Sequence, residues 1–336
     1  MRRREGVVAL ALAQSLACML APAAVANAAP FAYITNQGSH DVSVIDLASQ
    51  KVVATVPVGR SPAGVVASSR AGRVFVSNPD SKTISVIDMR EQSVVDTLAA
   101  GDGPVGIDAA PDGSRVYAAD WYRSQLLVFD TKASAKTAAG HGAPIASIAV
   151  GKAPAGVAAS DREGSVFVAE RDDDSVALVD VNAQRVRARV RVGSHPFALL
   201  YDAPRQRLYA LNVQSNDVSV IDTRNPDRLA VLATVKVGKA PYGAALAADG
   251  ALIYVTNQHD DTVSVIDAES LTLLRTLTGF GYPEGVASHG DRVYVVNWMD
   301  DRVSVLDARS GQALGSIDTG QNSRGFGAFI GAPMPP

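Results

Sequence analysis

The stretch YVTNQHDDTVSVID, Tyr254 to Asp267, decides the fold of this chain. It contains two short segments rich in β-branched and aromatic residues on either side of a polar turn, which is the pattern of two antiparallel strands. The same phrase occurs in seven copies, each opening on an aromatic residue and reaching an aspartate thirteen residues later. The aromatic residues are Tyr33, Phe75, Tyr117, Phe167, Tyr209, Tyr254 and Tyr294, and the aspartates are Asp46, Asp88, Asp130, Asp180, Asp222, Asp267 and Asp307. A constant interval in all copies indicates an internal repeat.

Each repeat contains signals for four strands. After the aspartate come a turn, a third strand such as KVVATVPV, a Gly-x-x-Pro-x-Gly element such as Gly59 to Gly64, and a short fourth strand such as GVVAS. Successive aromatic residues are 40 to 50 positions apart. A four-stranded unit with this period is a propeller blade. We therefore predict an all-β fold, a seven-bladed β-propeller with four antiparallel strands per blade.

The two ends of the repeat region predict how the ring closes. The segment from Phe31 to Tyr33 already belongs to the second strand of a blade, whereas Ser323 to Ile330 has the pattern of an innermost strand with nothing after it. We expect the C-terminal strand to join the N-terminal blade, because closure removes exposed sheet edges. The largest insertion, within Ala133 to Pro144, is too short for an eighth blade.

The first thirty residues differ from the rest of the chain. Three arginines at positions 2–4 precede an apolar run at 7–25, and small residues follow. This order is typical of a secretory signal peptide, so we predict a signal at 1–28 and a single propeller domain at 29–336, located in the periplasm or secreted. A permanent membrane anchor is the alternative. Polar residues interrupt the run and no second apolar span follows, so we expect no membrane span in the mature chain.

Composition narrows the chemistry of the mature chain. Cys18 is the only cysteine and falls in the predicted signal, so we expect neither a disulfide nor a thiol nucleophile. Without residues 1–28 the chain has 28 basic and 33 acidic side chains, a net charge of −5. This balance argues against a nucleic-acid surface, which requires clustered positive charge.

The segments YITN and YVTN and their TVSVID partners resemble the YVTN-repeat, or YncE-like, seven-bladed propellers of secreted bacterial proteins, over Phe31 to Ile330. Two copies depart from the pattern, because Asp120 and Glu170 replace the asparagine that closes the first strand elsewhere. The family is similar in fold to the heavy subunits of periplasmic amine dehydrogenases, where a propeller supports a redox subunit. The resemblance therefore implies a scaffold role, but no single activity, because propellers carry unrelated functions on one scaffold.

Most repeated residues have a structural explanation. We expect the seven aspartates to accept backbone N–H bonds in the turns that follow them, and the glycines and prolines to set backbone geometry. Where one repeat has a different residue from the other six, that residue does not have the structural role that the others share. These departures gather on the first face of the ring, defined here as the face onto which the turn inside each phrase and the Gly-x-x-Pro loop open. The candidate ligand- or partner-binding residues on it are Asp120, Trp121, Tyr122, Arg123, Glu170, Arg171, His195, Phe197, Tyr242, Glu284, Trp298 and Arg324.

Exposed aromatic residues beside arginines and carboxylates supply the apolar area and directional polar groups of a binding surface. The alternative is that these side chains only cover the blade ends. A metal site is not predicted, because His40, His195 and His259 lie on different blades and the run from Asp172 to Asp174 lacks the spacing of a calcium loop. We predict no cofactor.

The sequence leads to three hypotheses on function. We favour a non-enzymatic, monomeric binding or scaffold protein that holds an unidentified partner protein or small ligand at the first face. The main alternative is an enzyme, since seven-bladed propellers include lactonases and lyases that use histidine and carboxylates, often with a divalent cation, at the axial opening. Convergence of Glu170, His195, Glu284 and Arg324 in one axial pocket would favour the enzyme. Single-stranded DNA binding is a weaker alternative, because it requires a basic groove.

Overall fold

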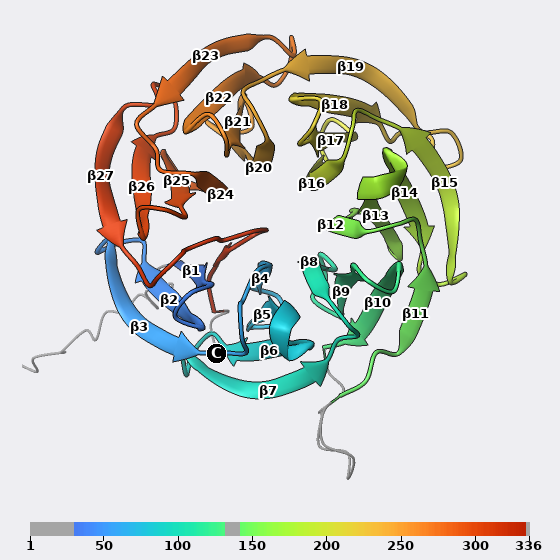
Figure 1. Ribbon diagram of the computed structural model, residues 1–336, viewed down its shortest axis with the longest axis horizontal. Helices are drawn as coiled ribbons and strands as arrows, with labels where there is room; N and C mark the ends of the chain where they lie inside the picture. The colour runs from blue at the N-terminus through green and yellow to red at the C-terminus, as the bar shows by residue number, and fades with distance from the viewer. Residues whose placement is uncertain (1–29, 132–141, 334–336) are drawn as a thin grey trace, which may run out of the picture.

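Seven four-stranded antiparallel sheets surround one axis in the computed structural model, which describes residues 30–131 and 142–333 (Figure 1). The predicted all-β, seven-bladed propeller with four antiparallel strands per blade is therefore confirmed. The predicted signal at 1–28 lies outside the described residues, as does most of the insertion predicted within Ala133 to Pro144. Within the described ranges, no helix has the length and apolar character of a membrane span.

Every blade runs from an inner strand beside the axis to an outer strand at the rim. Blade 1 consists, from the inside outward, of β28 (Ile330–Gly331), β1 (Phe31–Asn36), β2 (Asp41–Asp46) and β3 (Lys51–Pro57). Blades 2 to 7 follow in chain order and consist of β4 (Val65–Ser68), β5 (Arg73–Asn78), β6 (Thr83–Asp88) and β7 (Ser93–Ala99); β8 (Pro104–Ala109), β9 (Arg115–Asp120), β10 (Gln125–Asp130) and β11 (Ala146–Ala149); β12 (Pro154–Ala159), β13 (Ser165–Glu170), β14 (Ser175–Asp180) and β15 (Arg185–Arg191); β16 (Pro196–Asp202), β17 (Arg207–Asn212), β18 (Asp217–Asp222) and β19 (Ala230–Lys236); β20 (Pro241–Ala247), β21 (Leu252–Asn257), β22 (Thr262–Asp267) and β23 (Leu273–Thr278); and β24 (Pro283–His289), β25 (Arg292–Asn297), β26 (Arg302–Asp307) and β27 (Ala313–Asp318). Two one-turn helices, η1 (Pro79–Ser81) and η2 (Arg171–Asp173), complete the described elements.

The two middle strands of each blade carry the repeated phrase and form the core. In β21 and β22 almost every residue is buried, because a neighbouring blade covers each face of the sheet. Large aromatic side chains such as Tyr254 fill the space between blades and are fully buried. The outer strands are covered less completely, and the burial of their residues alternates with exposure. The position in the blade therefore explains why the middle strands are apolar on both faces.

The repeated polar and glycine residues have the structural roles that the sequence predicts. Asp46 Oδ1 accepts the backbone N–H groups of Ala48 at 2.7 Å and Ser49 at 3.2 Å. Asp88, Asp180, Asp222, Asp267 and Asp307 accept equivalent bonds in their own turns. The second glycine of the Gly-x-x-Pro-x-Gly element lies where the next blade's backbone approaches. A Cβ on Gly106, for example, would lie 2.0 Å from the carbonyl oxygen of Ala155, so only glycine fits there.

Ring closure depends on a closing segment, Ser323 to Gly331, which forms the inner part of blade 1. Ile330 pairs with Ala32 of β1, Phe329 O accepts the N–H of Tyr33 at 2.9 Å, and Arg324 N donates to Thr35 O at 2.8 Å. The chain's two ends therefore complete one sheet, as predicted.

The closing segment departs from the predicted continuous strand in its middle. Ser323 pairs with Asn36 and Phe329 bonds Tyr33, so six steps along the closing segment face three steps along β1. Gly325 and Gly327 have positive φ angles of 62° and 123°, and the chain between Arg324 and Phe329 leaves the sheet toward the axis. Only Ile330 and Gly331 form a regular strand. The surplus length and the two glycines explain this difference.

The displaced middle of the closing segment bonds the neighbouring blades. Phe326 O accepts the N–H of Val65 and Ala328 O accepts the N–H of Ala67, both at 2.8 Å, so the segment also pairs with β4 of blade 2. On its other side, Arg324 O accepts the N–H of Gly285 in blade 7 at 2.9 Å. One segment therefore joins three blades.

Truncation of the closing segment tests its role. A chain ending at Asn322 should lose more than about 5 kcal/mol of unfolding free energy, because it loses the buried Phe326 and Phe329 and opens the ring. A control chain ending at Ala332 keeps all of these contacts, including the pair formed by Gly331 and Phe31. Equal melting temperatures for the two truncations in differential scanning calorimetry would contradict the closure scheme.

A carboxylate between blades 3 and 4 predicts a pH dependence of stability. Asp108 accepts the N–H groups of Ala159 and Ala109, each at 2.8 Å, and burial raises its pKa to about 6 although these bonds oppose the shift. Because this pKa exceeds that of the unfolded chain, the contribution to stability is complete below about pH 4 and is lost as the pH rises through 6.

Relative to Asp108→Asn, the parent protein should therefore lose about 2–3 kcal/mol of unfolding free energy between pH 4 and pH 7.5, measured by urea denaturation. Asp267→Asn is the control with the opposite sign, because the backbone N–H and hydroxyl of Ser270 lower the pKa of Asp267. A difference between parent and Asp108→Asn that does not vary with pH would contradict this account of Asp108.

Candidate functional site

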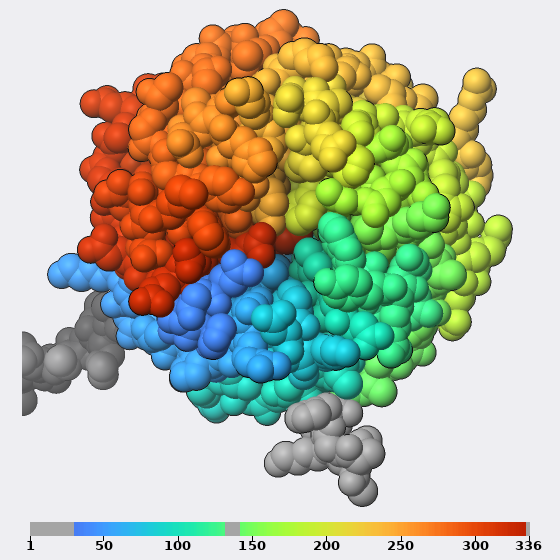
Figure 2. All heavy atoms as spheres, in the orientation of Figure 1, coloured from blue at the N-terminus to red at the C-terminus, as the bar shows by residue number. Residues whose placement is uncertain are grey.

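The first face is formed as the sequence predicts. The turns inside the phrases bond the Gly-x-x-Pro loops, as when Trp121 N donates to Gly103 O at 2.9 Å and Gln258 N donates to Ala240 O at 3.0 Å. The helices η1 and η2 belong to these turns. Figure 2 shows a hollow at the axis of the ring, with the closing segment, in dark red, visible inside it. We call this hollow the axial mouth.

The residue that follows the proline of each Gly-x-x-Pro element comes where the chain enters the inner strand of a blade. Ser323 takes the place of proline in the closing segment, and Arg324 follows it. From blade 2 onward these residues are Ala63, Val105, Ala155, Phe197, Tyr242, Glu284 and Arg324. The ring of side chains is therefore uneven: small apolar residues belong to blades 2 to 4, and large or charged ones belong to the remaining positions.

A buried polar network joins three of the predicted residues. Arg324 Nε donates to Glu284 Oε2 at 2.6 Å, and its Nη2 donates to the hydroxyl of Tyr242. Gln258 Nε2 donates to the other oxygen of Glu284 at 2.8 Å. Glu284 is 2% exposed, and the Arg324 side chain is 18% exposed. The sequence prediction did not include Gln258, which completes the network.

Burial and charge shift the protonation equilibria of this network. Burial raises the pKa of Glu284, although Arg324 and Gln258 act in the opposite direction. Burial alone would lower the pKa of Arg324, but Tyr242 and Glu284 outweigh it and raise that pKa. Arg324 therefore stays cationic, and its positive charge offsets the free-energy cost of burying an ionised Glu284.

An aromatic cluster packs beside the polar network and shares Tyr242 with it. Phe197 stacks on Tyr242 with ring centroids 4.6 Å apart, and Phe326 lies 5.2 Å from Phe197 and 5.5 Å from Tyr242. Phe326 comes from the displaced part of the closing segment and is buried. Phe197, Tyr242, Glu284, Arg324 and Phe326 together are called the axial cluster below.

Trp121 extends the aromatic surface from the axial cluster onto the first face. Its ring lies 6.3 Å from that of Phe197, and the guanidinium carbon of Arg171 lies 5.4 Å from its centroid. Trp121 is partly exposed, and the neighbouring Tyr122 is 77% exposed. Trp121, Tyr122 and Arg171 form a group that we call the Trp121 wall.

Trp298 belongs to a second group, which we call the Trp298 ledge. Its ring lies 5.5 Å from that of Tyr282, and Tyr282 lies 5.7 Å from the ring of His259. Trp298 Nε1 donates to Gln37 Oε1 at 3.2 Å, which bonds blade 7 to blade 1. The tryptophan therefore has a structural bond in addition to its partly exposed ring.

The two acidic residues that replace asparagine are buried in the blade ends. Asp120 accepts the N–H groups of Asp102 at 3.0 Å and Gly103 at 3.1 Å. Glu170 accepts the N–H of Gly151 at 2.7 Å and also bonds Arg189 of β15. Both residues are 0% exposed. Their carboxylates hold the Gly-x-x-Pro loops in place.

The remaining candidates on the first face contact local partners. Arg123 Nε donates to Asp102 Oδ2 at 2.6 Å in an exposed pair. His195 Nδ1 lies 3.0 Å from Ser194 Oγ and 3.7 Å from Asp174 Oδ1. His40 accepts the N–H of Ser61, and His259 contacts Tyr282, so the three histidines have different neighbours. Within the described residues, no group of three or more His, Cys, Asp or Glu has the arrangement of a metal site.

The structure therefore brings together part of the predicted site. Phe197, Tyr242, Glu284 and Arg324 meet at the axis, with Trp121 and Arg171 beside them. Glu170 faces Arg189 at the outer strand, and His195 contacts the turn of blade 4. The four residues whose convergence would favour an enzyme do not form one pocket.

The sequence reasoning missed Phe326. Its signal was the segment GFG at 325–327, in which two glycines flank an aromatic residue inside a supposed strand. Glycine weakens a strand and marks a bend or a close approach, so this pattern indicated a departure from the sheet. The closing segment is longer than the part of β1 that it pairs with, and only the observed pairing shows this.

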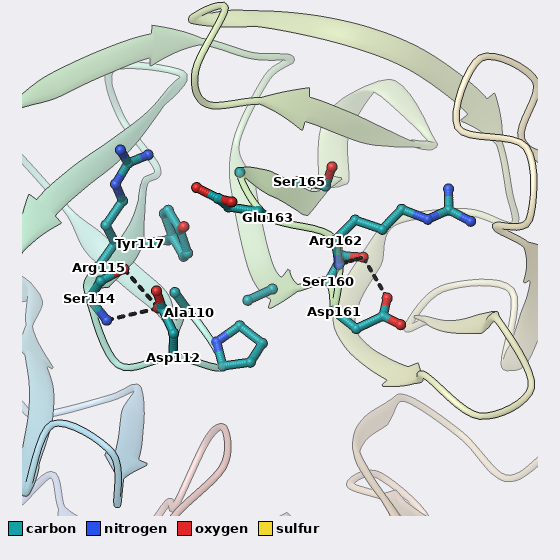
Figure 3. Close-up of a pocket in the computed structure, with 13 residues that line it drawn as sticks. Ala110, Asp112, Ser114, Arg115, Tyr117, Ser160, Asp161, Arg162, Glu163 and Ser165 are labelled. Carbon is teal, nitrogen blue, oxygen red and sulfur yellow. Dashed lines mark hydrogen bonds between the residues drawn. The ribbon is translucent and has the colours of Figure 1, made fainter.

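A separate cavity of about 250 Å³ opens between blades 3 and 4 on the opposite face (Figure 3). Its walls come from the turn and strand residues 110–117 and 159–165, and Figure 3 shows the side chains of Tyr117 and Glu163 near its centre. None of the predicted site residues lines it.

The fold and the axial mouth define the class of protein as a closed seven-bladed β-propeller in which the closing segment completes blade 1. A sequence model described as YncE-like β-propeller matches residues 140–334. The chain belongs to the YncE-like β-propeller family. The comparison with curated proteins found no match.

Solved structures with the same fold have low sequence identity. Hydrazine synthase of Kuenenia stuttgartiensis is 19% identical with a TM-score of 0.71, and the match covers 87% of this chain and 99% of that one. A functionally unknown protein of Desulfotomaculum acetoxidans DSM 771 is 16% identical with a TM-score of 0.73, covering 90% and 99%. The dihydro-heme d1 dehydrogenase NirN is 16% identical with a TM-score of 0.66, covering 88% and 74%. These likenesses show the fold.

Substitution of the buried ion pair tests the axial cluster. Arg324→Met should cost about 3–5 kcal/mol of unfolding free energy, because it leaves Glu284 buried without its cation. The double variant Arg324→Met with Glu284→Gln should recover part of this loss, since no buried charge remains. Urea denaturation measures the cycle, and a double-variant cost equal to the sum of the two single costs would show that the pair is not coupled.

Proposed function

We propose that this protein is a periplasmic or secreted binding protein that holds a partner protein or ligand at the axial mouth of its first face. One observation carries the proposal. The Trp121 wall presents partly exposed aromatic rings and a guanidinium directly beside the axial cluster. Rigid aromatic area combined with arginine is typical of the energetic centre of protein interfaces.

The same geometry favours binding over catalysis. Glu284, Arg324, Tyr242 and Gln258 bond one another. Both oxygens of Glu284 thus already accept a hydrogen bond from within the network. The candidate general base His195 lies among the acidic side chains of the blade-4 turn. A role of the network in fixing the shape of the mouth accounts for all of its contacts.

The proposed location rests on the signal-like segment at 1–28, and the proposed scaffold role rests on the family. Members of a propeller family share the ring and differ in the side chains around its mouth, so the partner is specific to this chain's own residues. By their names, two structural neighbours are a synthase and a dehydrogenase. The enzyme alternative has its own test. It would be supported if the parent protein turned over a substrate and the Glu284→Gln variant did not.

Substitution of Trp121 tests the proposed site. In affinity capture from periplasmic extract followed by mass spectrometry, a bound protein or small molecule should be retained by the parent and reduced at least tenfold by Trp121→Ala. Leu314→Ala, an exposed position on the rim, is the control and should retain the partner. The melting temperature of Trp121→Ala should stay within a few degrees of the parent.

Two results would contradict the proposal. Equal retention by the parent and Trp121→Ala would place the binding surface elsewhere on the molecule. An insoluble Trp121→Ala would show that the tryptophan belongs to the core of the fold.

A further inference from the structure

The outer strand of blade 4 carries arginine at each of its four exposed positions, whereas its siblings have lysine only at an end, as Lys51 in β3 and Lys236 in β19. β15 has the sequence RVRARVR, and its four arginines, Arg185, Arg187, Arg189 and Arg191, are all exposed while the residues between them are half-buried. These four residues are called the arginine strip. They belong to the edge strand of the sheet, because β15 pairs with β14 on one side only.

Comparison with the other blades shows that the strip is not required by the fold. Arg187 stands at the bulge of its strand, where five siblings expose an aliphatic side chain: Val53, Val95, Leu232, Leu274 and Leu314. The siblings of Arg189 are threonine or serine. These five outer strands therefore fill the positions of Arg187 and Arg189 without arginine, and the strip needs another explanation.

Only one member of the strip has a clear structural role. Arg189 Nε lies 2.9 Å from Glu170 Oε2 and neutralises that fully buried carboxylate. Arg185 and Arg191 have no hydrogen bond or contact ion pair with any residue that the structure describes. Arg187 crosses to blade 5, where Nε and Nη2 bind the two oxygens of Asp227 at 2.7 and 3.0 Å. The strip therefore holds positive charge beyond what the fold uses.

Asp227 shows which chemistry the strip accepts. Its side chain is 69% exposed, and it binds Arg187 through two parallel bonds, the geometry in which guanidinium recognises carboxylate. This loop carboxylate occupies one position, while Arg185, Arg191 and the Nη atoms of Arg189 remain open to further carboxylates.

We propose that the arginine strip binds an acidic segment of a partner protein in extended conformation, with carboxylates at alternate positions. Residues two apart on a strand are about 6.6 Å apart, and the same spacing separates alternate side chains of an extended partner. The free edge of β15 also offers backbone groups to such a segment, as in strand addition.

A polypeptide fits the surface better than a nucleic acid does. Single-stranded nucleic acids bind through aromatic side chains on which bases stack, in addition to basic residues. In the part of the chain that the structure describes, Tyr122, 77% exposed, is the one aromatic residue among the exposed large hydrophobic side chains, and it belongs to the first face and not to the rim of blade 4. The surface is also independent of the proposed axial mouth.

Binding of a labelled eight-residue peptide of alternating glutamate and threonine, followed by fluorescence anisotropy at low salt, tests the proposal. Arg185→Glu with Arg191→Glu should weaken binding at least tenfold, and Arg185→Glu alone should weaken it several-fold. Lys51→Glu is the matched control, because Lys51 takes the place of Arg185 on β3 and the charge change is the same. It should leave the affinity within twofold of the parent. Asp227→Ala should tighten binding, because it frees Arg187.

Three outcomes would overturn the proposal. One is an equal loss of affinity in Arg185→Glu and Lys51→Glu, which would show that only the net charge of the protein matters. Another is Asp227→Ala binding that is no tighter than that of the parent. The last is an oligothymidylate that binds more tightly than the peptide and depends on the same arginines, which would assign the strip to nucleic acid. Melting temperatures of all variants check that the fold is intact.

Discussion

The structure depends on the backbone hydrogen bonds between the closing segment and β1, because they turn seven like blades into a ring. An open row of blades would leave the inner edge of β1 unpaired and one face of blades 1 and 7 uncovered. The bonds of Tyr33 with Phe329, Val65 with Phe326 and Gly285 with Arg324 prevent this by joining blade 1 to both of its neighbours. The same segment supplies Arg324 and Phe326 to the axial cluster. Closure and the shape of the candidate site therefore share one origin.

This double use explains why the axial mouth is asymmetric in a ring of repeats. A perfect repeat would place the same residue seven times around the axis. The seven positions at the mouth would then be equivalent, and none would offer a ligand a different contact from the others. Here the closing segment has surplus length, so Phe326 joins the axial cluster and Arg324 requires a buried carboxylate, which Glu284 supplies. The corresponding positions of blades 2 to 4 keep small apolar side chains such as Ala155. The propeller can thus have an asymmetric axial mouth while the strands of its blades keep the repeated structure.

The fold was predictable because the repeated interval between an aromatic residue and an aspartate fixes the strand pair, and seven copies of it fix the ring. The site was predictable only in part. Departures from the repeat singled out Glu284 and Arg324, which form a buried ion pair, but the same reasoning gave Asp120 and Glu170, whose carboxylates bond the backbone of adjacent loops. A departure shows that a position has changed its partner. It does not show whether the new partner is inside the protein, because that depends on packing across blades.

The net charge of the chain also gave no indication of the arginine strip. A net charge of −5 over the mature chain is an average, while four arginines on one edge strand form a local surface.

Native-state hydrogen exchange tests most directly the claim that the closing segment locks the ring of blades. If the closing segment locks the ring, the amides of Tyr33, Val65 and Ala67 should exchange only by global unfolding, with the same free energy as Phe167 in the core of blade 4. Exchange of those three amides at a lower free energy, while Phe167 stays protected, would contradict the claim.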